Sequence, residues 1–138
     1  MASRIAAVPD VRAELLNYQR SFAANPPNGK KGAILDGRDI GTVVCPDADY
    51  KFFLTASPAV RADRRVKELR EKGLEVIYDR VLRDIIARDE QDRSRAVSPL
   101  VPADDALLLD TDELDADAVF AAAVDYIQPQ NATVEGER

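Results

Sequence analysis

Apolar residues recur with helical spacing in four stretches of the chain. In the first, residues 9–23, they follow Pro9, a residue that favours the first turn of a helix. The stretch carries its apolar face on Val8, Val11, Leu15, Tyr18 and Phe22. A second stretch follows the capping pair Ser57-Pro58, carries Ala59, Ala62, Val66 and Leu69 on one face and ends near Gly73. A third runs from Tyr78 toward Arg95, and Asp115 is placed to cap a fourth over residues 116–127. The pattern therefore predicts four amphipathic helices.

Short apolar runs alternate with these helices. They read GAILDG over residues 32–37, YKFFLTA over 50–56 and ALLLDT over 106–111, and their aromatic and aliphatic content favours strands. Short strands that alternate with amphipathic helices predict an α/β fold with a parallel sheet. In such sheets ligands bind at the carboxyl ends of the strands. The polar residues 129–138 are expected to form a flexible tail.

Composition narrows the classes of function. The 138 residues are enough for one compact domain, and 46% hydrophobic with 32% charged residues is typical of a soluble globular protein. A net charge of −6 argues against binding to nucleic acid or to anionic membranes. The sequence holds one cysteine and no histidine, which excludes an internal disulfide, a cysteine-based zinc site and histidine chemistry. Without an apolar run of about 20 residues we expect no membrane span, and a cytoplasmic location.

The first cluster of candidate chemistry is Asp36-Gly37-Arg38-Asp39, directly after a predicted strand. One interpretation is a turn in which the aspartates hydrogen-bond to their own backbone. The other is a ligand site, in which Asp36 organises a metal ion while Arg38 and Asp39 face the ligand.

Two further clusters are rich in arginine. If the third helix persists, Arg88, Asp92 and Arg95 lie at positions i, i+4 and i+7, within an arc of roughly 60°. They form either a solvated ladder of ion pairs or an anion site, because guanidinium forks suit phosphate oxygens. Another group, Arg61, Arg64 and Arg65, is either a solvated helix face or part of the same site. Three such groups without a hydrolytic nucleophile fit phosphoryl transfer, which depends on positioning and charge stabilisation.

Two segments of the chain resemble the carboxyl-terminal part of bacterial cytidylate kinases. They are LDGRDIGTVVCPDADYKFFLTASPAVRADRR and ARDEQDRSRAVSPLVPADDALLLDT, and the resemblance extends from about Ser3 to Ile127. It implies a partial P-loop nucleoside monophosphate kinase core over residues 1–128, with a helical lid at about residues 61–95. It also implies transfer of the γ-phosphoryl group of ATP, bound with Mg²⁺, to CMP or dCMP.

The resemblance assigns roles residue by residue. Asp36, Arg38 and Arg95 are expected to be catalytic, with Asp36 directed toward the magnesium ion. Arg61 and Arg64 belong to the lid and are expected to close over the ATP phosphates. The expected contacts of the nucleoside monophosphate are Ser3, Arg12 and Asp39 at the cytosine ring, Arg38 and Arg95 at the phosphate, and Arg88 and Asp92 near the sugar.

The phosphate-binding pattern G-x-x-x-x-G-K-[ST] does not occur in these residues, since Gly29-Lys30 lies in a loop of proline and asparagine. In the family the P-loop and its central strand precede the equivalent of Ser3. We therefore expect a truncated kinase that is inactive alone. Alternatives are a non-catalytic nucleotide-binding remnant and an interaction module with solvated arginines. We also expect it to need a missing N-terminal half, or to self-associate through exposed strand edges.

Overall fold

The computed structural model describes residues 8–95 and 99–136, with side chains described as far as residue 128. The chain divides into two compact units, residues 1–48 and residues 49–138. Each unit contributes helices that the apolar pattern predicted, and the strands lie in the second unit.

The first unit is built around helix α2, Pro9–Ala24. Its bounds confirm the prediction, with proline in the first turn and the backbone N–H of Asn25 closing the last turn on the carbonyl of Ser21 at 2.9 Å. A short 3-10 turn, Pro27–Gly29, and a π-helical turn, Ile40–Val44, follow. Asn28 has a φ of 58°, in the left-handed region that asparagine tolerates better than most residues.

The prediction of a strand over residues 32–37 is wrong. This stretch has no regular secondary structure, and the two strands of the described sheet both lie in the second unit. The side chain of Ile34 is 96% exposed. A strand is stabilised by hydrogen bonds to a neighbouring strand, so an apolar run without such a partner gains nothing from the extended conformation.

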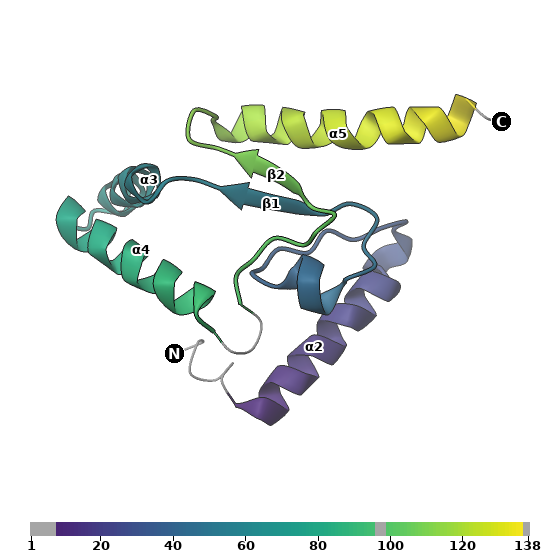
Figure 1. The fold of residues 1–138 in the computed structure, drawn as a ribbon, viewed down its shortest axis with the longest axis horizontal. Coiled ribbons are helices and arrows are strands. Elements are labelled where there is room, and N and C mark those ends of the chain that lie inside the picture. The colour runs from purple at the N-terminus through teal and green to yellow at the C-terminus, as the bar shows by residue number, and fades with distance from the viewer. Residues whose placement is uncertain (1–7, 96–98, 137–138) are drawn as a thin grey trace. The chain divides into compact units, whose positions relative to one another are not determined.

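The second unit confirms an α/β fold with a parallel sheet (Figure 1). Strand β1 pairs with strand β2 in parallel, with Phe52 opposite Leu107 and Thr55 opposite Asp110. In chain order the elements are β1 (Phe52–Thr55), α3 (Pro58–Glu71), α4 (Tyr78–Arg93), β2 (Leu107–Asp110) and α5 (Ala116–Gly136). The carboxyl ends of both strands therefore lie at one edge of the sheet, the edge from which α3 departs.

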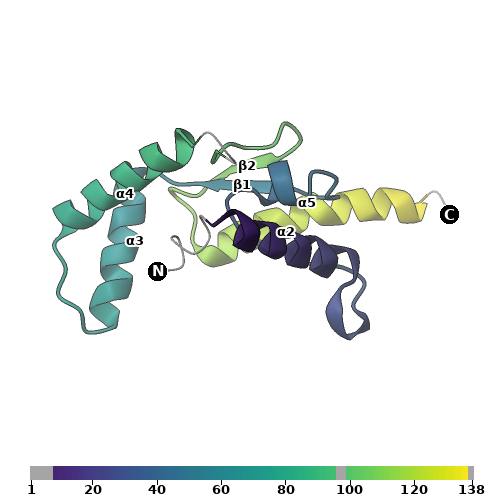
Figure 2. The ribbon, with the colours of Figure 1, turned by 90° about the horizontal axis from the view of Figure 1, so that it is seen from below.

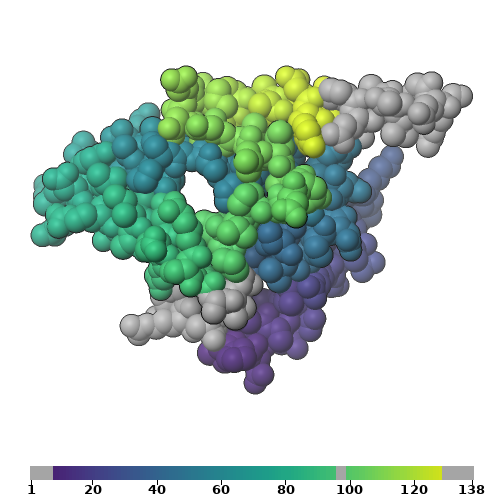
Figure 3. Space-filling view, in the orientation of Figure 1, coloured from purple at the N-terminus to yellow at the C-terminus, as the bar shows by residue number. Residues whose placement is uncertain are grey.

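Helices α3 and α4 lie side by side and are joined by the loop over residues 72–77 (Figure 2). The hydroxyl of Ser57 caps α3 by accepting the N–H of Val60, and Gly73 ends the helical segment with a φ of 79°. Ala62 and Val66 are buried on the face of α3 that the pattern predicted. In the space-filling view the two helices form one continuous body (Figure 3).

The last helix begins where predicted but extends further. The carboxylate of Asp115 accepts the N–H of Ala118 at 2.8 Å, as expected for a capping residue. Helix α5 continues past residue 127 to Gly136. The expected mobility of the tail stays a prediction. None of the helices in the described part of the chain is long and apolar enough to cross a membrane.

Candidate functional site

The turn over Asp36-Gly37-Arg38-Asp39 is exposed at its start and half-buried at its end. The carbonyl of Asp39 accepts the N–H groups of Val43 at 2.9 Å and Val44 at 3.2 Å, which builds the π-helical turn directly behind it. A β-carbon at Gly37 would lie 3.0 Å from Cγ1 of Ile40, tighter than ordinary contact. Glycine therefore lets this turn pack closely against Ile40.

Arg20 fixes the π-helical turn to helix α2. Its Nε donates to the carbonyl of Val44 at 3.1 Å, and a terminal nitrogen donates to the carbonyl of Val43 at 3.0 Å. Sequence analysis did not select Arg20, because it lies in an ordinary amphipathic helix with no motif around it. Arg12, the predicted base contact, is half-buried on the same helix, and Ser3 lies outside the described residues.

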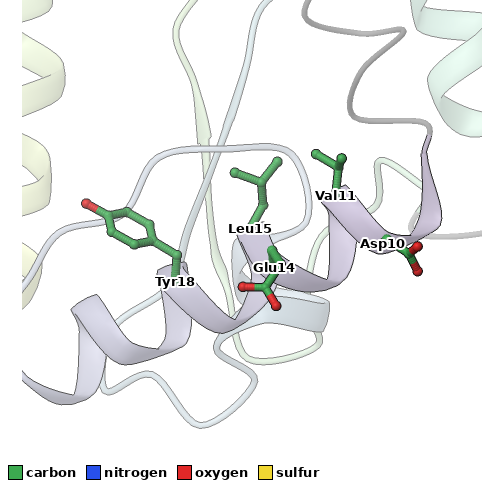
Figure 4. A pocket seen from close by; sticks show the side chains of 5 residues that line it. All are labelled: Asp10, Val11, Glu14, Leu15 and Tyr18. Atoms are coloured by element: carbon green, nitrogen blue, oxygen red, sulfur yellow. The ribbon is translucent and has the colours of Figure 1, made fainter.

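Two shallow hollows lie among the described residues of this unit. The larger, of about 510 Å³, lies along α2 (Figure 4). Val11 and Leu15 project to one side of the helix, and the carboxylates of Asp10 and Glu14 flank them. Because it carries two carboxylates, this surface repels phosphate. The smaller, of about 180 Å³, includes a predicted site residue and is lined by Tyr18, Gln19, Phe22, Leu35, Asp36 and Ile40.

In the second unit, Arg88 and Asp92 lie one turn apart on α4, as predicted. Arg88 is exposed, whereas Asp92 is buried with 5% of its surface exposed. The prediction that Arg95 continues the same helical face is wrong, because α4 ends at Arg93. The hydroxyl of Ser94 donates to the carbonyl of Glu90 at 2.6 Å, and the carbonyl of Asp92 accepts the N–H of Leu100 at 3.0 Å. The N–H of Ser94 still bonds to the carbonyl of Glu90 at 3.0 Å, whereas the carbonyl of Asp92 bonds to a residue outside the helix, so helical bonding ends here.

Arg61 connects three elements. Its Nε donates to the carbonyl of Ala56, just after β1, at 2.9 Å. Both terminal nitrogens donate to the carboxylate of Asp89 on α4, one of them at 2.8 Å to Oδ1 and the other to Oδ2. The hydrogen bond to Asp89, together with its negative charge, raises the pKa of Arg61 above its usual value despite partial burial. Arg61 thus stays charged and joins α3 to α4.

Arg64 is held at the carboxyl end of β2. One terminal nitrogen donates to the hydroxyl of Thr111 at 3.1 Å, and the other donates to the carbonyls of Thr111 at 2.5 Å and Leu114 at 3.3 Å. Thr111 in turn donates its hydroxyl proton to the carbonyl of Thr55 at 2.9 Å. The predicted lid arginines therefore lie at the sheet edge where a parallel sheet binds ligands.

The described residues contain no group of three or more histidine, cysteine, aspartate or glutamate side chains that could hold a metal ion. Asp36 is exposed and offers a hard carboxylate ligand of the kind that Mg²⁺ accepts. Its role toward magnesium stays a prediction.

Comparison with known proteins decides the family. A family model described as cytidylate kinase matches residues 1–129. The chain belongs to the cytidylate kinase family. The cytidylate kinase of Paramagnetospirillum magneticum is 64% identical over 126 residues, which are 91% of this chain and 59% of the relative. That of Methylocella silvestris is 56% identical over 127 residues, 92% of this chain and 57% of the relative. The chain therefore spans less than two thirds of the length of these cytidylate kinases.

Like Arg20, Asp89 and Thr111 lie beside predicted site residues but are not indicated by the sequence pattern. Asp89 lies next to Arg88 but points about 100° away around the helix, so it fell outside the selected face. Thr111 appeared only as the last residue of a predicted strand. In both cases the partner is an arginine more than 25 residues away in sequence, at separations of 28 and 47. The spacing of neighbouring residues does not predict pairs that are so far apart in sequence.

Proposed function

We propose that this chain forms the CMP-binding part of a kinase that transfers the γ-phosphoryl group of ATP to CMP or dCMP. Membership of the cytidylate kinase family, over residues 1–129, is the observation that carries the proposal. The described structure supports it with two sets of charged groups on separate units. They are the turn at Asp36, Arg38 and Asp39, and the helical pair Arg88 and Asp92.

The chemistry of these groups suits a nucleoside monophosphate. Arg38 and Arg95, both exposed, offer guanidinium forks for the phosphate of CMP. Arg88 and Asp92 on α4 would contact the sugar, with Asp92 as an acceptor for hydroxyl groups. Arg12, Asp39 and Ser3 would read the cytosine ring, where a carboxylate can accept the exocyclic amino group.

Magnesium would enter with ATP. Mg²⁺ commonly binds one or two carboxylates together with substrate phosphates rather than a cage made only of protein ligands. Asp36 is the carboxylate that would contribute on this chain, and the ion would neutralise charge on the transferred group. Arg61 and Arg64 bring two further guanidinium groups to the lid segment near residues 61–95.

These 138 residues alone are proposed to bind CMP without transferring a phosphoryl group. The P-loop pattern does not occur among them, and its backbone amides and lysine supply much of the charge stabilisation in such kinases. An assay of CDP formation from CMP and ATP should therefore show no turnover with this chain. Turnover by these residues alone would contradict this part of the proposal.

Titration calorimetry tests the nucleotide assignment. We expect CMP to bind more tightly than UMP, because uracil lacks the amino group from which Asp39 would accept a hydrogen bond. Asp39→Ala should remove the preference, on the order of tenfold, since one hydrogen bond to a charged group contributes about 1.5–3 kcal/mol. Asp47→Ala, an exposed aspartate in the same unit, is the matched control. Equal binding of CMP and UMP by the unmodified chain would contradict the assignment.

A further inference from the structure

Arg61 uses three of its guanidinium N–H groups inside the protein. Nε donates to the carbonyl of Ala56 at 2.9 Å, and each terminal nitrogen donates to one oxygen of Asp89. A guanidinium has five such groups in a fixed plane. The side chains are 34% exposed for Arg61 and 15% for Asp89, so water has limited access to the pair. Arg61 is therefore engaged by the protein itself on both the strand side and the helix side.

We propose that Arg61 is a positioning residue that acts through Asp89 to hold the nucleotide-binding part of α4, rather than a direct phosphate contact. The inference rests on the proposed CMP-binding function, because it assigns a task to the same site. Ala56 follows β1 directly, Arg61 lies in the first turns of α3, and Asp89 lies in the second half of α4. The three residues thus form one continuous connection from the end of the sheet to α4.

The position of Asp89 explains which residues this connection controls. Asp89 is adjacent to Arg88 and three residues before Asp92. Along the helix axis it therefore lies about 1.5 Å from Arg88 and about 4.5 Å from Asp92. A two-pronged bond between planar groups fixes both the distance and the orientation of the carboxylate. Holding Asp89 in this way fixes the rotation of α4 about its axis, and with it the directions of Arg88 and Asp92.

Arg64 makes a different connection and does not duplicate this one. Its guanidinium bonds to Thr111 and Leu114, which follow β2, and neither residue belongs to α4. Loss of Arg61 or Asp89 should therefore loosen the second half of α4, while Arg64 still joins α3 to the end of β2. Because the two residues act as one unit, their individual losses should not add.

CMP affinity measured by titration calorimetry on the full chain tests the inference. We expect Arg61→Gln and Asp89→Asn each to weaken CMP binding on the order of tenfold, and the double variant to weaken it no further. The exchanged pair, Arg61→Asp with Asp89→Arg, restores the ion pair between α3 and α4 but not the bond to Ala56, and should recover part of the affinity. Glu90→Gln is the matched control, with the same loss of charge on the next residue of α4, and should bind as the unmodified chain does.

Three outcomes would overturn the inference. The first is that Asp89→Asn binds CMP within twofold of the unmodified chain. The second is that the effects of the two single variants on CMP affinity add. The third is that the exchanged pair recovers folding but no CMP affinity. The last result would assign Arg61 a direct contact. Circular dichroism of each variant separates lost binding from lost folding.

A second measurement keeps the two proposals separable. If the unmodified chain binds no CMP, the proposed function fails, but urea unfolding of the unmodified chain, the two single variants and the double variant still reports on the connection. The equilibrium constant of unfolding should show coupling between Arg61 and Asp89 on the order of tenfold. Absence of coupling would overturn the inference independently of CMP.

Discussion

Thr111 lies directly after β2, with 7% of its surface exposed, and its hydroxyl group joins two other elements. The hydroxyl accepts a hydrogen bond from Arg64 on α3 and donates one to the carbonyl of Thr55 at the end of β1. Thr111→Val keeps the shape of the side chain and removes both bonds. It should lower the free energy of unfolding by about 1–3 kcal/mol, because buried partners lose their bonds. Urea unfolding measures the change.

Thr55→Val, at the end of the neighbouring strand β1, is the control for Thr111→Val. The hydroxyl of Thr55 is exposed and lies 3.5 Å from the carbonyl of Leu109, at the limit of a hydrogen bond. Its removal should change the free energy of unfolding by less than about 0.5 kcal/mol, as for most surface substitutions. Equal effects at Thr55 and Thr111 would show that the bond to Arg64 contributes nothing.

Lys51 and Asp105 form an ion pair in the second unit. The ammonium group of Lys51 lies 2.8 Å from Oδ1 of Asp105, and the lysine side chain is 7% exposed. This hydrogen bond lowers the pKa of Asp105 below its ordinary value of 3.8. The folded pKa is the lower one, so the pair's contribution to stability is complete above pH 3.8 and is lost as the pH falls through the folded pKa.

Carbon-detected NMR titration of carboxyl groups tests this pair. In Lys51→Met the pKa of Asp105 should rise back toward its ordinary value. Glu68 is an internal control in the same spectra, because its pKa is lowered by hydrogen bonds from Lys72 and Arg65 and not by Lys51. An Asp105 pKa that does not change in Lys51→Met would show that another group lowers it.

At the scale of an element, α3 depends on its amino-terminal cap. The hydroxyl of Ser57 accepts the N–H of Val60 at 3.3 Å, and the N–H of Ser57 itself donates to Asp112 at 2.6 Å. Ser57→Ala removes only the first bond and should cost about 1 kcal/mol in the free energy of unfolding. Ser57→Asp keeps an acceptor at this position and should recover most of it. Loss of stability in Ser57→Asp equal to that in Ser57→Ala would contradict a capping role.

Elements were predictable where local signals agree. Proline in the first turn of α2, the cap at Ser57 and the glycine at position 73 are all local, and the helices begin and end near them. The run around Ile34 carried the same apolar signal as the true strands, but a strand also requires a partner, and that information is not local. At the end of α4 the carbonyl of Asp92 bonds to the N–H of Leu100, beyond the helix, which the apolar pattern does not record.

In the candidate site, too, local relations were predictable from the sequence and long-range contacts were not. Arg88 and Asp92 were predictable as one helical face because their relation is set by helix geometry alone. The partners of Arg61 and Arg64 were not, because Asp89 and Thr111 meet them only after α3 packs beside α4 and Arg64 reaches the end of β2. Family resemblance placed both arginines in the site, whereas the structure shows which protein groups hold them.

At the scale of the whole molecule, the described core is small. Among the described residues the buried apolar side chains are Val44, Ala62 and Val66, and the sheet has two strands. Both outer edges of a two-stranded sheet present unpaired backbone groups, and such a sheet is marginally stable without further strands. Leu54 and Leu108 on these strands are 57% and 60% exposed. These features favour association of the chain with itself.

We therefore expect a molar mass that rises with protein concentration in analytical ultracentrifugation. Leu108→Lys places a charge on the exposed face of β2 and should shift association to higher concentrations, because a desolvated lysine opposes strand pairing. Gln128→Lys, at an exposed position of α5, adds the same charge outside the strands and should leave association unchanged. A monomer at every concentration, with a single cooperative thermal transition, would show that the open strand edges do not drive association.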